Sequence, residues 1–84
     1  MKVEVRWTAE ALDLLTYLTQ SDQRVIFNKA SRLQTFPEMY PTCVTGRFSG
    51  CRCFVAGNWV VYYRFVSGTV FIRGIWPARI PLPE

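Results

Sequence analysis

Arginines dominate the chemistry available to the second half of this 84-residue chain. Residues 39–84 hold five arginines and one acidic residue, whereas residues 1–38 hold five basic and five acidic residues, so the net charge of +4 belongs to the second half. These arginines are Arg47, Arg52, Arg64, Arg73 and Arg79. A one-sided positive field suits a polyanionic partner, either nucleic acid or an acidic protein segment; the alternative is an ordinary solvated surface.

The other reactive side chains exclude several kinds of site. The chain has no histidine, which removes the usual acid–base catalyst at neutral pH and any zinc site of cysteine and histidine ligands. The three cysteines are Cys43, Cys51 and Cys53, and Cys-x-Cys within a strand is poor spacing for metal ligands. We interpret them as small, buried residues of a reducing compartment, and we expect neither a metal nor a cofactor.

Length and composition predict one small domain, residues 1–84. Half of the residues are hydrophobic, which is enough for a folded core. No apolar run approaches the roughly 20 residues that span a bilayer, and residues 1–6 alternate charged and apolar types, unlike a signal peptide. We therefore expect a cytoplasmic protein that makes no membrane contact.

Three segments must position the arginines. Runs rich in β-branched and aromatic residues near 50–55, 59–66 and 69–76 are separated by the short breaks Ala56-Gly57-Asn58 and Ser67-Gly68. Breaks of this kind are the strongest local signal for consecutive antiparallel hairpins. The pattern therefore predicts a three-stranded meander.

Turn lengths predict which residues of the meander face each other. A two-residue turn at 67–68 pairs Tyr62 with Arg73. At 56–58 we expect a three-residue loop, because a two-residue loop would bury an unpaired Arg52 guanidinium at a cost of several kcal/mol. The predicted core side carries Cys51, Cys53, Val61, Tyr63, Phe65, Val70 and Ile72. The predicted open side carries Arg52, Phe54, Val60, Tyr62, Arg64, Phe71, Arg73 and Ile75.

The first half of the chain predicts a strand and two helices. Residues 3–5 alternate in polarity as in a short, half-buried strand. Thr8 is a good N-cap for a helix over 9–19, whose apolar residues recur at helical spacing. Ser21-Asp22 then breaks this helix and caps a second helix over 22–35.

The order of these elements defines an α+β fold. It consists of a short N-terminal strand, a two-helix antiparallel hairpin and a three-stranded antiparallel meander packed on the helices. Residues 37–49 form an irregular crossing segment. Three prolines after Trp76 exclude a helix or a central strand there.

Several short motifs follow this layout in order. The strongest is Asn58-Trp59-Val60-Val61-Tyr62-Tyr63-Arg64, and the others are Val5-Arg6-Trp7-Thr8, Ala11-x-Asp13-Leu14, Leu33 with Pro37, Gly46-Arg47, Gly50-Cys51-Arg52, Val70-x-Ile72-x-x-Ile75, Arg79 and Pro81. In this pattern, which covers nearly the whole chain, the sequence resembles the RelE/ParE toxin family of bacterial type II toxin–antitoxin systems.

The resemblance implies a compact toxin that a small antitoxin neutralises. An acidic partner that is partly disordered when free would suit the basic half of the chain. One branch of the family enters the ribosomal A site and cleaves mRNA with basic residues on the open face of the sheet. The other branch poisons DNA gyrase and is not known as a nuclease. A third alternative is a non-toxic relative that binds only its antitoxin.

Residue by residue, the resemblance leaves these alternatives open. Arg52 matches a position that is often basic in the cleaving branch, and Arg79 matches the arginine of the family near the C-terminus. Two positions where that branch carries further basic residues are Phe54 and Val60 here. The gyrase alternative fits Val60, but gyrase-directed members carry a longer helical hairpin than residues 9–36 provide.

Cleavage of RNA by its own 2′-hydroxyl requires a base, an acid and charge stabilisation at phosphorus. Arginines stay protonated and supply the charge, which leaves tyrosines for proton transfer. We therefore predict ribosome-dependent mRNA cleavage. The predicted catalytic residues are Arg52, Tyr62 and Arg79, and the predicted RNA-binding residues are Arg47, Arg64 and Arg73.

Each of these side chains also has a structural alternative. Tyr62 and Tyr63 could simply pack within their strand, and Arg64 could pair with Glu4 or with the C-terminal carboxylate. Trp59 and Trp76 could cover the edges of the sheet or anchor an antitoxin helix.

Overall fold

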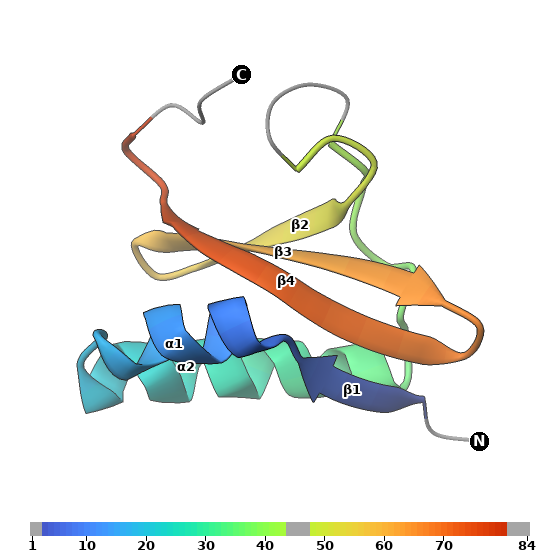
Figure 1. Cartoon of the computed structure of the whole chain (residues 1–84), viewed down its shortest axis with the longest axis horizontal. Coiled ribbons are helices and arrows are strands. Elements are labelled where there is room, and N and C mark those ends of the chain that lie inside the picture. The colour runs from blue at the N-terminus through green and yellow to red at the C-terminus, as the bar shows by residue number, and fades with distance from the viewer. Residues whose placement is uncertain (1–2, 44–47, 81–84) are drawn as a thin grey trace.

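The computed structural model describes residues 3–43 and 48–80, and its centre is a four-stranded sheet of order β1-β4-β3-β2. The strands are β1 (Glu4–Trp7), β2 (Arg52–Ala56), β3 (Trp59–Val66) and β4 (Thr69–Pro77). The helices are α1 (Ala9–Thr16) and α2 (Gln20–Ser31), the latter continued by a 3-10 turn at Arg32–Gln34. Both helices lie on one side of the sheet (Figure 1). The predicted α+β fold is confirmed.

The N-terminal strand joins the meander as a parallel neighbour of β4. Its register runs from Glu4 opposite Thr69 to Trp7 opposite Ile72. The Thr8 amide then donates to the Ile72 carbonyl at 3.0 Å, and the chain turns away into α1. Among the described residues, the second half of β4 therefore has no strand neighbour on this side.

Threonine side chains cap both helices. The Thr8 hydroxyl accepts a hydrogen bond from the Ala11 amide, as predicted, and the Thr19 hydroxyl accepts one from the Asp22 amide at 3.1 Å. The predicted cap at Ser21-Asp22 is wrong, because the Thr19 side chain binds the amide of Asp22, the third residue of the helix. The Asp22 carboxylate lies in the first turn, where it interacts favourably with the helix dipole. None of the described helices is long and apolar enough to cross a membrane.

The core lies between the helices and the underside of the sheet. Helical residues pack there against alternate residues of β2, β3 and β4. The members contributed by the helices are Ala11, Leu15, Ile26 and Ala30, joined by Leu33 of the 3-10 turn. The members contributed by the sheet are Phe54, Ala56, Val61, Tyr63, Val70, Ile72 and Ile75.

Strands β2 and β3 meet in a register that differs from the predicted one. Ala56 pairs with Trp59 across a two-residue turn, so Arg52 pairs with Tyr63. The predicted three-residue loop is therefore wrong. Gly57, at φ +61, supplies the left-handed conformation that a tight two-residue hairpin turn requires.

The two-residue turn does not leave the Arg52 guanidinium unpaired, as had been expected from the sequence. Its Nη1 atom donates to the Tyr40 carbonyl at 2.7 Å and to the Glu38 carbonyl at 3.2 Å, and its Nη2 atom pairs with Glu38 Oε2 at 3.3 Å. The crossing segment thus satisfies a charge that the sequence alone left without a partner.

A β-bulge shifts the register between β3 and β4. Next to the predicted two-residue turn at 67–68, Val66 pairs with Thr69 and Arg64 with Phe71, and Tyr63 pairs with Ile72. The register then slips, so Tyr62 pairs with Gly74 and the predicted pair of Tyr62 with Arg73 is wrong. Arg73 is the extra residue of the bulge, a position at which a side chain is re-aimed.

The two register changes move several side chains to the other side of the sheet. Phe54 and Ile75, which were predicted to face outward, are 3% and 4% exposed in the core. Cys53, which was predicted to face the core, pairs with Tyr62 on the side away from the helices, and Cys51 follows by alternation. We call this side the open face.

Candidate functional site

Two arginines converge on one polar cavity on the open face. Arg64 of β3 and Arg73 of β4 line a cavity of about 270 Å³ together with Glu10, Phe48, Ser49 and Cys51. Both arginine side chains are exposed. Two guanidinium groups beside one hollow can bind a phosphate or carboxylate through several charge-assisted hydrogen bonds. We call this hollow the arginine cavity.

The turn before β2 forms one wall of the arginine cavity. Gly50 has φ +86, and a Cβ built on it would lie 3.6 Å from an Arg64 guanidinium nitrogen. The turn itself is closed by the Cys51 amide, which donates to the Phe48 carbonyl at 2.9 Å. The positive φ of this turn favours glycine, whereas a Cβ there would make only an ordinary van der Waals contact with the guanidinium.

An aromatic stack forms the floor beside the arginines. The Phe48 ring lies on Tyr62 with centroids 4.5 Å apart and planes 17° apart. Gly74 makes room for it, because a Cβ at that position would lie 2.4 Å from the Phe48 ring. The stack leaves Tyr62 only 6% exposed.

Burial also sets the protonation of the groups in this floor. It raises the pKa of Tyr62 to about 12, with smaller contributions from the Cys43 and Cys53 thiols. Burial likewise raises the pKa of Cys51, although Arg64 and Arg73 act in the opposite direction. At neutral pH Tyr62 is therefore a protonated phenol, which can donate a hydrogen bond but does not serve as a base.

The structure does not bring the three predicted catalytic residues together. Arg52 lies on the helix side of the sheet, bound to Glu38 and Tyr40, whereas Tyr62 lies on the open face. Arg79 is exposed in the turn after β4, where it lines a separate cavity with Trp59 and other residues. The open-face positions of β2 and the residue before it belong to Cys51, Cys53 and Val55, not to Arg52 and Phe54.

Of the predicted RNA-binding residues, Arg64 and Arg73 share the arginine cavity, and Arg47 lies outside the described residues. The structure also shows the contacts of residues named in the structural alternatives. Glu4, a proposed partner of Arg64, pairs with Arg6 at 2.9 Å. The indole nitrogen of Trp59 donates to Asp22 Oδ2 at 3.2 Å, and the indole nitrogen of Trp76 donates to the Ile80 carbonyl at 2.7 Å.

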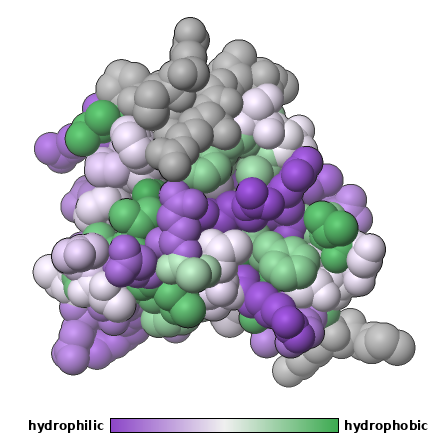
Figure 2. Space-filling model, in the orientation of Figure 1, coloured by the Kyte–Doolittle hydropathy of each residue, from purple (hydrophilic) through white to green (hydrophobic). Residues whose placement is uncertain are grey.

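Polar and apolar surfaces lie next to each other on this molecule. Figure 2 shows hydrophilic residues across the middle of the face in view, with hydrophobic residues gathered on either side of them. Several large hydrophobic side chains are exposed, among them Leu14 at 38%, Tyr17 at 80% and Ile80 at 54%. Exposed apolar groups that cluster beside a polar rim are typical of partner-binding sites.

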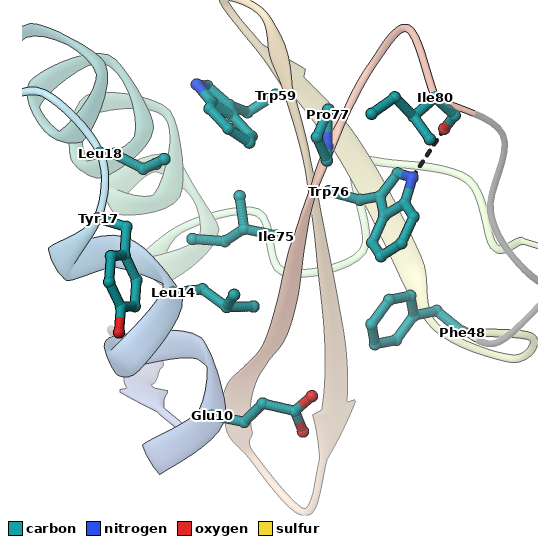
Figure 3. A pocket seen from close by; sticks show the side chains of 10 residues that line it. All are labelled: Glu10, Leu14, Tyr17, Leu18, Phe48, Trp59, Ile75, Trp76, Pro77 and Ile80. Atoms are coloured by element: carbon teal, nitrogen blue, oxygen red, sulfur yellow. Dashed lines mark hydrogen bonds between the residues drawn. The ribbon is translucent and has the colours of Figure 1, made fainter.

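Leu14, Tyr17 and Ile80 help to line an apolar groove of about 380 Å³ between α1 and the second half of β4, which β1 does not cover. Figure 3 shows Leu14 and Leu18 extending toward Ile75, while Trp76 and Phe48 lie on the other side of the strands. The remaining lining residues are Glu10, Trp59 and Pro77. We call this feature the β4 groove.

Sequence analysis missed the β4 groove for a clear reason. Leu14 and Leu18 belong to the apolar stripe of the first helix, which periodicity assigns to the core. Part of this stripe lies outside the core, because β1 pairs only with the first half of β4 and leaves the second half uncovered. Tyr17, at the end of the same helix, was the one visible signal of an exposed apolar surface.

No protein-family profile matches the chain, and no curated protein matches its sequence significantly. Solved structures do match its fold. The RelE–RelB complex from the archaeon Pyrococcus horikoshii contains a chain that superposes with a TM-score of 0.76 at 16% identity, over 96% of this chain and 100% of that chain.

Two bacterial complexes match equally well. The RelBE2 toxin–antitoxin complex from Mycobacterium tuberculosis gives a TM-score of 0.77 at 20% identity, over 92% of each chain. The chromosomal ParDE system from P. aeruginosa gives 0.76 at 13% identity, over 93% of this chain and 98% of that chain. The chain therefore has the fold of RelE/ParE toxins, and RelE and ParE complexes resemble it to the same degree.

Proposed function

We propose that this chain is the toxin of a type II toxin–antitoxin pair and acts in the cytoplasm on ribosome-bound mRNA. The fold supports the class, because toxin–antitoxin complexes match it over nearly the whole chain. The observation that carries the choice of target is the arginine cavity, in which Arg64 and Arg73 lie beside an aromatic stack. Guanidinium groups bind phosphates, and aromatic rings accept unstacked bases, so together they suit single-stranded RNA.

In the proposed reaction, Arg64 and Arg73 stabilise the charge that develops at phosphorus when the 2′-hydroxyl attacks. Arg79, which is exposed in the turn after β4 and lines a separate cavity, is proposed to contact a neighbouring phosphate of the same RNA. Tyr62, with a pKa of about 12, keeps its proton and acts at most as a donor to a phosphate oxygen. Glu10, which lines the arginine cavity from α1, is the one carboxylate among its described lining residues, and charge stabilisation and positioning by the arginines supply most of the catalysis.

The antitoxin is proposed to occupy the β4 groove. The groove offers exposed leucine and aromatic surface for the apolar side of a segment that folds on binding. The charge of the second half of the chain then favours a segment with acidic residues on its other side. Leu14→Asp should abolish binding of the proposed antitoxin. Leu12→Asp is the matched control, because Leu12 is 46% exposed on the same helix but does not line the groove.

The target is tested by inducing the chain without its antitoxin and mapping the 5′ ends of cellular mRNA. We expect new ends inside translated regions, and a loss of about 100-fold in their formation when Arg64 and Arg73 are both changed to glutamine. Arg24→Gln combined with Arg32→Gln removes the same charge from exposed positions on α2 and the 3-10 turn, and should leave cleavage unchanged. Intact mRNA during growth arrest would exclude the nuclease.

One observation favours a second candidate, a gyrase inhibitor without nuclease activity. The open-face side chains from β2 and the residue before it are Cys51, Cys53 and Val55, so none of these positions carries a basic group. Charge stabilisation then rests on fewer arginines than the sequence predicted. This candidate predicts that the purified chain inhibits supercoiling by gyrase while translation continues. Normal supercoiling together with arrested translation would exclude it.

A further inference from the structure

Two of the three cysteines lie in contact on the open face, at the edge of the sheet. Cys43 Sγ and Cys53 Sγ are 3.2 Å apart. A disulfide bond is about 2.05 Å long, so the sulfur atoms would need to approach by only about 1.2 Å. Both residues are partly exposed, whereas Cys51 is 5% exposed, so small reagents can reach this pair more easily than the third thiol.

The backbone already holds the two cysteines together. Cys43 donates its amide to the Cys51 carbonyl at 2.7 Å, and the Cys53 amide donates to the Pro41 carbonyl at 3.2 Å. A bridge between Thr42 and Arg52 lies between these two hydrogen bonds. Residues 41–43 therefore run antiparallel to residues 51–53, with Cys43 opposite Cys51, and Cys53 is the diagonal neighbour of Cys43 across the two strands.

We propose that Cys43 and Cys53 form a dithiol site that reacts with low-molecular-weight disulfides such as oxidised glutathione and closes to an intramolecular disulfide. One thiolate attacks the glutathione disulfide, forms a mixed disulfide and releases one glutathione. The second thiolate then attacks the protein-bound sulfur, forms the Cys43–Cys53 bond and releases the other glutathione. Two protein thiols are oxidised and one glutathione disulfide is reduced to two thiols, so atoms and electrons balance.

The site lies beside the proposed working surface. The Cys43 and Cys53 thiols are close enough to Tyr62 to contribute to the rise in its pKa. Closing the disulfide would tie the crossing segment covalently to β2 next to the stack of Phe48 on Tyr62. In a reducing cytoplasm the dithiol form prevails, and the bond forms when the glutathione pool becomes oxidising.

Burial makes the site slow to react at neutral pH. It raises the pKa of Cys53 to about 11, and hydrogen bonding to Cys43 adds to the shift. The Cys53 thiol is therefore protonated near neutrality and attacks slowly. Equilibration is best carried out in mildly alkaline buffer, where the thiolate fraction is larger.

The folded chain is equilibrated with mixtures of reduced and oxidised glutathione, and the exchange is quenched with acid. The remaining free thiols are then alkylated under denaturing conditions, and the protein is digested with trypsin. Cleavage after Arg32, Arg47, Arg52 and Arg64 leaves each cysteine in its own peptide. We expect a linked pair of the peptides 33–47 and 53–64, with Cys51 in peptide 48–52 still a free thiol. The oxidised chain should also unfold at a higher temperature than the reduced chain.

Cys51→Ser is the matched control and should form the same linked pair at the same glutathione ratio. Cys43→Ser and Cys53→Ser should form no linked pair and should instead retain a thiol or carry one glutathione. Peptide mapping of the unmodified sequence keeps the test decisive even where a serine variant folds poorly. A linked pair that contains Cys51, or accumulation of glutathione-bearing chain without a linked pair, would overturn the proposal.

Discussion

The two sides of the sheet each carry an arginine and a tyrosine, and the two pairs behave differently. On the helix side, Arg52 is bound by Glu38 and Tyr40, and the Tyr63 hydroxyl donates to the Pro37 carbonyl at 2.9 Å. On the open face, Arg64 is exposed and lines a cavity with Arg73.

The comparison separates residues that build the fold from residues available to a ligand. On the helix side, polar groups use their hydrogen bonds to anchor the crossing segment beneath the sheet. Among the described residues, no buried polar side-chain atom lacks a partner. Arg64 and Arg73 on the open face instead line the arginine cavity, which is large enough to accept a small anionic group. Residue type alone is therefore a poor guide to the role of an arginine here, because the side of the sheet decides whether its guanidinium is bound within the fold or lines a cavity.

The largest expected effect is on the helix side. Leu33 is fully buried between the helices and the sheet. Leu33→Ala should lower the free energy of unfolding by about 2–5 kcal/mol, because it removes buried apolar surface and leaves a cavity. Val66→Ala, at a position that is 49% exposed, should change it by less than about 1 kcal/mol. Urea denaturation measures both, and equal losses would contradict the assignment of the core.

Arg52→Gln tests the difference between the two arginine roles. Loss of its bonds to Glu38 and Tyr40 should lower the free energy of unfolding by about 1–2 kcal/mol. Arg64→Gln should leave stability within about 0.5 kcal/mol, because Arg64 is exposed. For growth arrest we expect the opposite order, provided that Arg52→Gln is folded. If folded Arg52→Gln protein loses toxicity while Arg64→Gln retains it, the predicted catalytic role of Arg52 is favoured.

Much of the fold followed from the sequence, because turn residues and alternation are local signals. The strands, the first helix cap and the hairpin turn at Ser67-Gly68 were all visible there. The register at the Gly57 turn depended instead on Glu38 and Tyr40, which bind Arg52 from a distant part of the sequence. No local pattern reveals these partners. The bulge at Arg73 is equally non-local, because Phe48 fills the space over Gly74 from another segment.

The candidate site was predictable only in part, for the same reason. Arg64 and Arg73 were predicted to lie on the same, open side of the sheet, and both line the arginine cavity. Arg52 was misplaced by one residue of register, which moves every side chain of a strand to the other face. The β4 groove depends on where β1 ends, and this length is set by tertiary contacts.

Gly74→Ala should have a smaller effect that is confined to the open face. The new methyl group would meet the Phe48 ring, so we expect the stack on Tyr62 to loosen and the free energy of unfolding to fall by about 1 kcal/mol. A double-mutant cycle provides the control: with Phe48→Ala already present, Gly74→Ala should cost nothing. A full cost in that background would place the strain elsewhere.

The last effect appears only at high pH and involves both sides of the sheet. Burial raises the pKa of both Tyr62 and Tyr63 to about 12, from a usual value of 10.0. Because the folded state keeps these protons longer than the unfolded state, their stabilisation is complete below pH 10 and is lost as pH rises toward 12. Thermal unfolding of Tyr62→Phe should show a shallower fall over this range, and an unchanged slope would contradict the burial of the phenol.

The most direct test of the open face as the working surface is the rate of protein synthesis after induction of the chain. Arg64→Gln with Arg73→Gln should restore synthesis nearly to the uninduced rate, with thermal stability unchanged. The charge-matched Arg24→Gln with Arg32→Gln should arrest synthesis as we expect of the unmodified chain. Arrest by the Arg64 and Arg73 variant at the unmodified level would contradict the proposed role of the open face.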